Sequence, residues 1–244
     1  MNDQIAIGAY KLSKTFKIPH EHNDTFKERL VSLGKSMTYE TFIALDEVSF
    51  EIAKGEFFGI IGRNGSGKST LLKILAGIYT ADKGTIILNG SIAPFLELGV
   101  GFNPELSGKD NIYLNGTILG LSSKEIDKKY KSILEFSELE RFIHMKLKNL
   151  SSGMQVRLAF ATSINADREI LLLDEVLAVG DLGFQKKCFD VFHNFIKNGK
   201  TIVFVSHNID AVRKYSNRVL YLETGRILHL GDPITVCNQY LTQY

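Results

Sequence analysis

The chain lacks several features that would assign it to a class at once. It has only two cysteines, Cys188 and Cys237, which are too few for a disulfide framework, and neither has a second Cys or His at metal-ligand spacing. It has no unbroken apolar run of about 18 residues, the length a transmembrane helix needs, and its first residues lack the pattern of a secretion signal. The net charge is only +2, which predicts no general affinity for nucleic acid or anionic lipid. These absences lead us to expect a protein that stays in the cytosol.

The most informative stretch that is present covers residues 62–70 and fits the phosphate-binding pattern G-x-x-x-x-G-K-[ST]. An apolar run precedes it and a helical pattern follows it, which is the strand, loop and helix context of such a loop. Backbone N–H groups and the helix N-terminus favour phosphate binding there, with Lys68 on the β- and γ-phosphates and Ser69 on Mg²⁺. The predicted nucleotide ligands of this loop are Gly62, Arg63, Asn64, Gly65, Ser66, Gly67, Lys68, Ser69 and Thr70.

The remaining patterns predict an α/β fold. Alternating or apolar runs predict strands at about 4–16, 48–52, 85–88, 170–173 and 202–205, and helical spacing predicts helices at about 110–119, 122–136 and 151–166. Strands that alternate with helices in the last third favour a parallel sheet covered on both faces. Asn89 and Gly90 predict a hairpin turn. Residues 17–42 read as an exposed excursion whose short amphipathic helix, 26–33, would dock on the protein's own surface or contact a membrane.

Polar residues at the ends of predicted strands and helices supply further candidate chemistry. Asp174 and Glu175 end a buried strand, where an Asp can hold Mg²⁺ and a Glu can orient an attacking water. Ser151 and Gly153 precede a helix and can present a hydroxyl and an N–H to an anion. His207 follows another strand and can bond a γ-phosphate. Taken singly, each of these residues has an ordinary structural explanation. In one chain with a phosphate loop, they strengthen the prediction of a nucleotide-hydrolysing site.

Taken together and in this order, the motifs resemble the ATP-binding subunits of ABC transporters over nearly the whole chain. Ser151 and Gly153 lie in the place of the signature L-S-G-G-Q, although Ser152 and Met154 replace a Gly and the Gln. Glu97 stands where a Gln is usual, and it can accept but not donate a hydrogen bond when ionised. Asp181 matches the position of a loop that touches the opposite subunit, and His207 matches the switch histidine.

One branch of that family is the most similar. Residues 96–99, 101–108 and 111–116, together with 174–181, resemble the ATPases that drive export of lipid-linked polysaccharides, whose cargoes are O-antigen, teichoic acid and capsular chains. The resemblance implies one ABC ATPase domain over 1–244. It would have a mixed-sheet core, an N-terminal antiparallel β subdomain and an inserted helical subdomain over about 97–166. We expect no carbohydrate-binding domain after Tyr244, because no room is left for one.

The resemblance also implies a mechanism. Two copies would bind two ATP molecules, each between the phosphate loop of one copy and Ser151 and Gly153 of the other. Lys68, Glu175 and His207 would be catalytic, Ser69 and Asp174 would hold Mg²⁺, and Glu97 and Asp181 would complete the nucleotide site. An aromatic ring would stack on adenine; Phe16 fits best by position, with Tyr39 and Phe42 as rivals.

The implied partners are a second ATPase subunit, a polytopic membrane permease and a lipid-linked polysaccharide as cargo, with no nucleic acid. The permease would be contacted through about 96–120, at the cytoplasmic face of the inner membrane.

Three other classes of protein compete with this interpretation. The first is the ATPase of another transporter class, an importer or a lipid exporter. The second is a soluble ABC ATPase that acts on DNA or ribosomes, although such chains usually carry long coiled coils or two cassettes, and this one has neither. The third group, GTPases and small-molecule kinases with a phosphate loop, fits less well. The chain has no N-K-x-D motif, and a kinase would not need Ser151 and Gly153.

Overall fold

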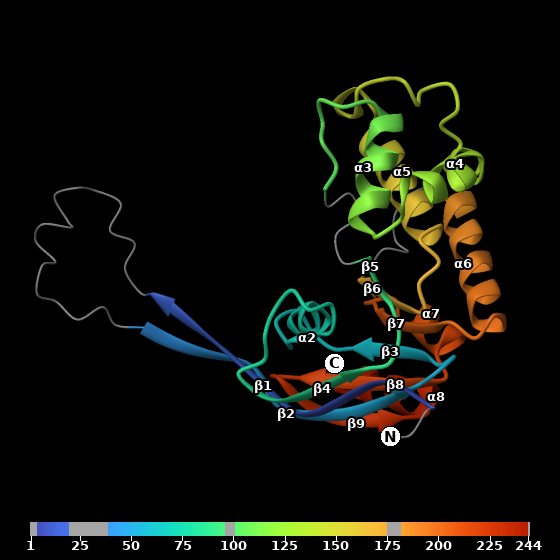
Figure 1. Ribbon diagram of the computed structural model, residues 1–244. Coiled ribbons are helices and arrows are strands. Elements are labelled where there is room, and N and C mark those ends of the chain that lie inside the picture. Colours follow the sequence, from blue (N-terminus) through green and yellow to red (C-terminus); the bar gives the residue numbers. More distant parts are fainter. Residues whose placement is uncertain (1–3, 20–38, 96–100, 175–181, 244) are drawn as a thin grey trace, which may run out of the picture.

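The computed structural model describes residues 4–19, 39–95, 101–174 and 182–243, which form two sheets with helices packed around them (Figure 1). The strands are β1 (Ile5–Pro19), β2 (Tyr39–Ala53), β3 (Phe57–Ile61), β4 (Lys83–Leu88), β5 (Ile92–Phe95), β6 (Ile170–Asp174), β7 (Thr201–Val205), β8 (Arg218–Glu223) and β9 (Arg226–Gly231). The helices are α2 (Lys68–Leu75), α3 (Gly108–Ile118), α4 (Ser123–Ser137), the 3-10 turn η1 (Leu147–Asn149), α5 (Ser152–Ile164), α6 (Leu182–Lys197), α7 (Ile209–Tyr215) and α8 (Pro233–Thr242). None of the helices in these ranges is both long and apolar enough to cross a membrane.

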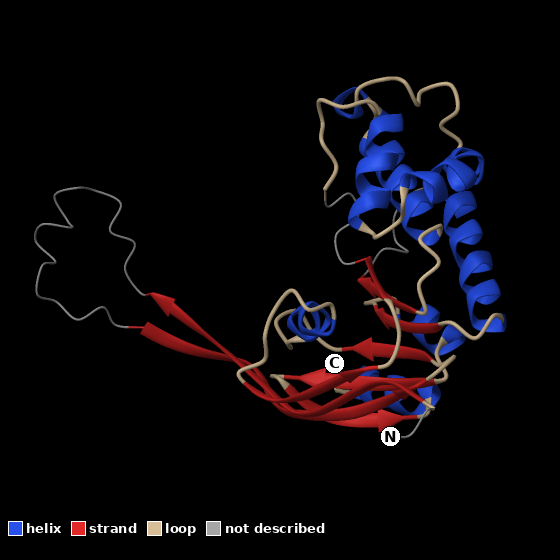
Figure 2. Ribbon diagram, in the orientation of Figure 1, coloured by secondary structure: helices blue, strands red, loops and turns tan. Residues whose placement is uncertain are grey.

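The smaller sheet is antiparallel, in the order β2-β1-β4. Strands β1 and β2 pair along their whole length, and the far end of this ribbon projects away from the rest of the molecule (Figure 2). The pairing continues to Pro19 and Tyr39, so the described ends of the predicted excursion, 17–19 and 39–42, are strand. The amphipathic helix predicted for 26–33 lies outside the described residues. This sheet is the predicted N-terminal antiparallel subdomain.

The larger sheet has the order β5-β6-β7-β3-β8-β9. Its first five strands are parallel, whereas β9 runs antiparallel to β8, so the predicted mixed sheet is confirmed. Strands β3 and β7 are buried at every position. Burial on both faces explains why these segments read as unbroken apolar runs rather than as alternating ones.

The hairpin predicted at Asn89 and Gly90 is wrong. Strand β4 pairs with β1 in the small sheet, whereas the next strand, β5, pairs with β6 in the large one. Asn89 holds the end of β4 on β1, because its Nδ2 donates to the Ile5 carbonyl at 2.9 Å and its backbone N–H to the Ala6 carbonyl at 2.9 Å. The turn residues therefore carry the chain from one sheet to the other, where a parallel neighbour satisfies the β5 backbone.

Three apolar clusters hold the layers together. One fills the space between the two sheets and includes Leu71, Leu72 and Leu75 of α2. The second covers the other face of the large sheet with α6, α7 and α8, and it contains Phe184, Cys188 and Phe192 of α6. The third lies within α3, α4 and α5, which form a helical region beyond the β5 and β6 edge of the large sheet (Figure 1). The inserted helical subdomain predicted from the sequence is thus present.

Candidate functional site

The phosphate loop joins β3 to α2 and is packed tightly between two other strands. Gly62 has φ +153°, and a Cβ there would lie 2.2 Å from the Leu222 carbonyl oxygen of β8. Gly67 has φ +106°, and a Cβ there would lie 2.4 Å from the Ala44 carbonyl oxygen of β2. Since no side chain fits at either position, the first and last glycines of the motif are required by the approach of the loop to its neighbours.

Lys68 is placed over this loop rather than toward solvent. It is 6% exposed, and its ammonium donates to the carbonyls of Gly62 at 2.8 Å and Arg63 at 2.7 Å. These bonds fold the long side chain back over the loop and keep the positive charge beside the N-terminus of α2. An anion at the helix start would therefore meet both the backbone N–H groups and this cation.

A pocket of about 610 Å³ opens beside the loop and brings together motifs that are far apart in the sequence. It is lined by Phe42, Asn64, Gly65, Gly67, Lys68, Ser69, Thr70, Asp174 and His207. The motifs meet because β3, β7 and β6 are neighbours, and parallel strands end at the same edge of a sheet. The predicted association of the phosphate loop with Asp174 and His207 is thus present in the structure.

A second pocket of about 490 Å³ shares Asn64, Gly65 and His207 with the first. It is lined by Arg63, Asn64, Gly65, Ser66, His207, Glu223, Thr224 and Tyr240. The last three residues come from the end of β8, the β8–β9 turn and α8. No sequence motif marks them, because tertiary packing alone brings them near the phosphate loop.

The oxygen donors fit a magnesium ion. The Ser69 hydroxyl and the Asp174 carboxylate both line the 610 Å³ pocket, beside Lys68. Within the part of the chain that the structure describes, no group of three or more His, Cys, Asp or Glu could hold a metal by itself. In nucleotide sites, Mg²⁺ takes only one or two protein oxygen ligands, because phosphates and waters complete its shell.

Among the three aromatic candidates for the base, the structure favours Phe42. Phe42 is 43% exposed and lines the pocket of the phosphate loop. Phe16 pairs with it across the ribbon but packs edge-on against Tyr79, with ring centroids 5.7 Å apart. Tyr39 lies farther out along the ribbon, opposite Pro19. The preference for Phe16 from sequence position stays a prediction.

Ser151 and Gly153 stand at the start of α5. Ser151 is the N-cap, and its hydroxyl accepts from the Met154 N–H at 3.2 Å. Gly153 is open on its outer side, since the nearest atom to a Cβ there is the Ser151 hydroxyl at 4.0 Å. Neither residue is among those that line the two pockets beside the phosphate loop of the same chain. The two pockets beside the phosphate loop are therefore formed without Ser151 and Gly153 of the same copy.

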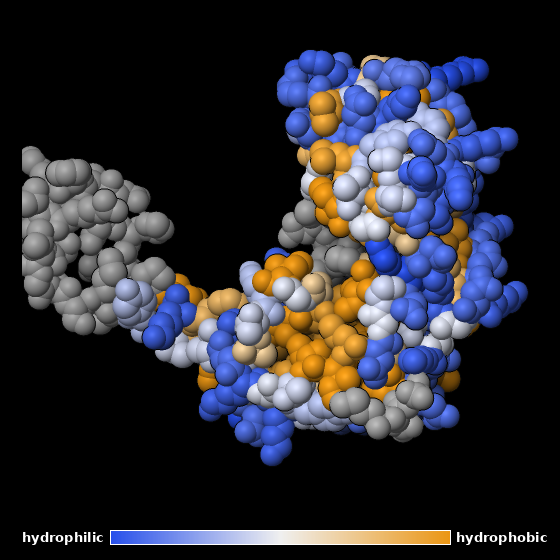
Figure 3. All heavy atoms as spheres, viewed as in Figure 1, coloured by the Kyte–Doolittle hydropathy of each residue, from blue (hydrophilic) through white to orange (hydrophobic). Residues whose placement is uncertain are grey.

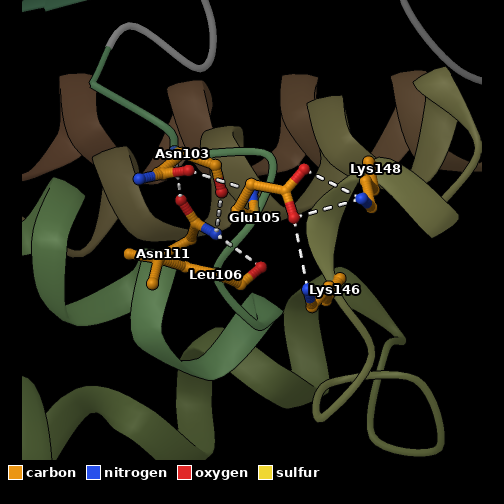
Figure 4. A network of polar contacts seen from close by, with 6 residues as sticks. All are labelled: Asn103, Glu105, Leu106, Asn111, Lys146 and Lys148. Carbon is orange, nitrogen blue, oxygen red and sulfur yellow. Dashed lines mark hydrogen bonds and ion pairs between the residues drawn. The ribbon is translucent and has the colours of Figure 1, made fainter.

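A polar network fastens the segment 103–106 to the loop that leads into α5 (Figure 4). It consists of Asn103, Glu105, Leu106, Asn111, Lys146 and Lys148. The buried Asn111 amide donates to the Asn103 carbonyl at 3.0 Å, and Glu105 accepts from Lys148 at 2.8 Å and from Lys146 at 3.2 Å. The described part of the predicted permease contact, 101–120, is thereby bonded to the residues just before Ser151.

Three predicted site residues fall outside the described ranges: Glu97, Glu175 and Asp181. Their neighbours are placed. Asp174 ends β6 beside the phosphate loop, and Leu182 begins α6.

Comparison with known proteins agrees with this arrangement. Residues 45–178 match the family described as ABC transporter. The O-antigen export system ATP-binding protein RfbB of Klebsiella pneumoniae is 46% identical over 199 residues, which cover 82% of this chain and 81% of that protein. The teichoic acids export ATP-binding protein TagH of Listeria monocytogenes is 38% identical over 240 residues, 98% of this chain and 71% of that protein.

Solved structures show the same fold. The dimeric, post-hydrolysis structure of the ATP-binding cassette MJ0796 has a TM-score of 0.75 at 24% identity, covering 93% of this chain and 98% of that one. A second solved chain, an ATP-binding subunit of an ABC transporter, has a TM-score of 0.77 at 20% identity, with 96% and 93% covered. With more than half of its residues in the family match, and relatives this similar over most of its length, the chain belongs to the ABC transporter family as an ATP-binding subunit.

Proposed function

We propose that this chain hydrolyses ATP to drive export of a lipid-linked polysaccharide, such as O-antigen or a teichoic acid, through a membrane permease. The observation that carries the ATPase part is the single pocket that Lys68, Ser69, Asp174 and His207 share. The polysaccharide part rests on the 46% and 38% identity to export ATP-binding proteins named for O-antigen and teichoic acids.

The working unit in this proposal is a pair of chains arranged head to tail. Ser151 and Gly153 do not line the pockets beside the phosphate loop of their own chain, so they are available to a nucleotide held by a second copy. The dimeric cassette MJ0796, which shares the fold, supports such a pairing. ATP would then bridge the two chains, and closure would depend on its tighter binding to the closed arrangement.

Each residue of the site then has a defined task. Phe42 stacks on the base, Lys68 and the loop N–H groups neutralise the phosphates, and Ser69 and Asp174 hold Mg²⁺. When bound, the ion supplies positive charge that stabilises the phosphates in the transition state. Glu175 orients the attacking water and His207 holds the γ-phosphate. Loss of that phosphate removes the bridge, and the pair reopens.

The permease would contact the helical region, which we propose spans about 97–166 of a single ATPase domain. Leu106, Phe142 and Met145 are exposed there by 36%, 42% and 40%, respectively. Leu106 and Met145 belong to segments joined by backbone hydrogen bonds, including one from the Leu147 N–H to the Leu106 carbonyl at 2.8 Å. In the space-filling view, hydrophobic residues also appear on the side of the helical region that faces the ribbon (Figure 3). The chain would lie at the cytoplasmic face of the membrane.

The chemistry is tested with Glu175→Gln. The amide keeps the size of the carboxylate but cannot polarise water as the carboxylate does, so we expect ATP affinity to be retained and hydrolysis to stall. Nucleotide titration and phosphate release measure the two properties separately. Turnover near that of the unmodified chain would remove Glu175 from the catalytic role.

The transport assignment is tested by purifying the tagged chain from detergent-solubilised membranes and identifying what accompanies it. We expect a polytopic membrane protein in near-equal amount, and accumulation of undecaprenyl-linked glycan when the chain is depleted. Recovery from the soluble fraction alone, with nucleic acid or ribosomes, would overturn export while leaving the ATPase chemistry intact.

A further inference from the structure

One carboxylate, that of Glu138, joins three helices. Glu138 directly follows α4, and its Oε2 accepts from the Arg157 guanidinium of α5 at 2.7 Å. Its Oε1 is bonded by the ammonium of Lys187 in α6. The three side chains are 48%, 20% and 45% exposed, so the group lies at the rim of the helix contact rather than in its interior.

Below this rim, the same helices share an aromatic cluster. The Phe160 ring of α5 lies 5.9 Å from Phe184 of α6 and 5.8 Å from Phe136 of α4. The Arg157 guanidinium also lies 5.0 Å from the Phe184 ring centroid, at cation–π distance. Arg157 and Phe160 are three residues apart on α5 and therefore share a face of that helix. The contact between α5 and α6 thus has an aromatic interior and a charged rim, at which Glu138 pairs with a cation from each helix.

The backbone of Glu138 is itself unusual. It has φ 59° and ψ 34°, the left-handed conformation that ends many helices but that glycine or asparagine normally adopts. For a residue with a Cβ this conformation costs about 1–2 kcal/mol. The backbone position alone would be better served by glycine, so the reason for a glutamate is the carboxylate.

The two helices that Glu138 connects serve different nucleotide sites in the proposed dimer. Helix α5 begins with Ser151 and Gly153, which act on the nucleotide of the partner chain. Helix α6 begins at Leu182, and in the proposed function Asp174 and Glu175, which precede it in the chain, act on the chain's own nucleotide. A rigid joint between α5 and α6 would make a displacement at one site felt at the other.

We propose that Glu138 is a positioning residue that couples the two nucleotide sites of the dimer by fastening α5 to α6. The inference rests on the proposed function, because it needs Ser151 to serve the partner's ATP. It assigns Glu138 no contact with the nucleotide. Its loss should therefore change cooperativity and turnover but not the affinity of the phosphate loop for ATP.

The test compares Glu138→Gly and Glu138→Gln with Glu135→Gln in the full-length chain. Glycine suits the left-handed backbone, so this variant removes the carboxylate without straining the end of α4. Glu135 is the matched control: it lies in the last turn of α4, just before Glu138, and pairs with Lys131 at 3.7 Å on an exposed face. We measure ATP affinity, the steady-state rate as a function of ATP concentration, and ATP-dependent dimerisation by light scattering.

For both Glu138 variants we expect ATP affinity within about twofold of the unmodified chain, a kcat lowered about fivefold or more, and a Hill coefficient reduced toward about 1. Lys187→Met should produce the same pattern to a smaller extent, because the Arg157 bond remains. Glu135→Gln should change none of these quantities.

Two results would overturn the inference. One is an unchanged kcat and Hill coefficient in Glu138→Gly; the other is a parallel loss of ATP affinity, kcat and thermal stability in all Glu138 and Lys187 variants, which would make the residue merely structural. Ser151→Gly, which retains most of the capping, distinguishes failure of the proposed shared nucleotide site from failure of the coupling through Glu138. If Ser151→Gly leaves kcat unchanged, the shared site itself is wrong; if it lowers kcat while Glu138→Gly does not, only the coupling is wrong.

Discussion

Phe42 and Phe16 are direct partners across the β1–β2 pairing, yet the two rings have different surroundings. Phe42 borders the pocket of the phosphate loop, whereas Phe16 packs against Tyr79 beyond α2. Of these two candidates for the base, Phe42 is therefore the one that lines the pocket of the phosphate loop.

Phe42→Ala should weaken ATP binding about tenfold, because stacking of a base on an aromatic ring contributes roughly 1–3 kcal/mol and 1.4 kcal/mol corresponds to tenfold. Phe16→Ala is the matched control and should weaken binding much less. Isothermal titration calorimetry with ATP measures both. A larger loss in Phe16→Ala would return the adenine site to the residue that sequence position favours.

Lys68→Ala should weaken ATP binding about 10- to 100-fold, since a hydrogen bond to a charged group contributes about 1.5–3 kcal/mol. Lys73→Ala is the control from the same helix; its ammonium lies 5.7 Å from the Tyr79 ring centroid, not over the loop. Fluorescent-nucleotide titration compares the two. Equal affinities for Lys68→Ala and the unmodified chain would contradict the phosphate-loop assignment.

Gly67→Ala should destabilise the fold by about 2 kcal/mol or more, because it combines a left-handed backbone with a Cβ pressed against the Ala44 carbonyl. Gly65→Ala tests the backbone contribution alone: Gly65 has φ +80°, but nothing lies within 4 Å of a Cβ there. Urea unfolding followed by circular dichroism gives both free energies. The steric argument fails if Gly65→Ala is the more damaging of the two.

Cys188 should make stability fall at alkaline pH. Burial raises the pKa of its thiol to about 12, from 9.0 for an unperturbed thiol. Because the folded state binds the proton more tightly, the stabilisation is complete below about pH 9 and is lost as the pH rises toward about 12. The free energy of unfolding should therefore drop less in Cys188→Ala than in the unmodified chain between about pH 8 and pH 10.5. Equal drops would indicate that the thiol ionises alike in both states.

The parts of the molecule that the sequence predicted are those set by short-range chemistry. The phosphate loop has its two closely packed glycines and its lysine within one stretch, and the helix predicted at about 122–136 is present as α4, which the capping box of Ser122 and Glu125 opens. The buried strands β6 and β7 were recognisable because both of their faces are apolar. The order of motifs then sufficed to identify the family, since their joint occurrence is specific even where single residues depart from the usual pattern.

What the sequence could not provide depends on contacts between distant segments. Whether β5 joins the strand before it or a strand far along the chain is decided by bonds such as that from the Ser91 N–H to Glu169, 78 residues away. Turn chemistry at Asn89 and Gly90 is the same in both cases, so it predicted a hairpin. The role of Glu138 was equally invisible, because a glutamate after a helix carries no sign of the two cations that approach it from α5 and α6.

The close approach of the phosphate loop to β2 also sets the distance between the groups that would bind the base and the phosphates. Gly67 is packed on the carbonyl of Ala44, and Phe42, two residues earlier on the same strand, lines the pocket of the phosphate loop. Strand β2 therefore sets the distance between the ring that would stack on the base and the loop that would bind the phosphates. A slip of β2 by one residue would turn Phe42 to the opposite face and move the carbonyl against which Gly67 rests. The register of a peripheral ribbon therefore determines how long a ligand the site can span.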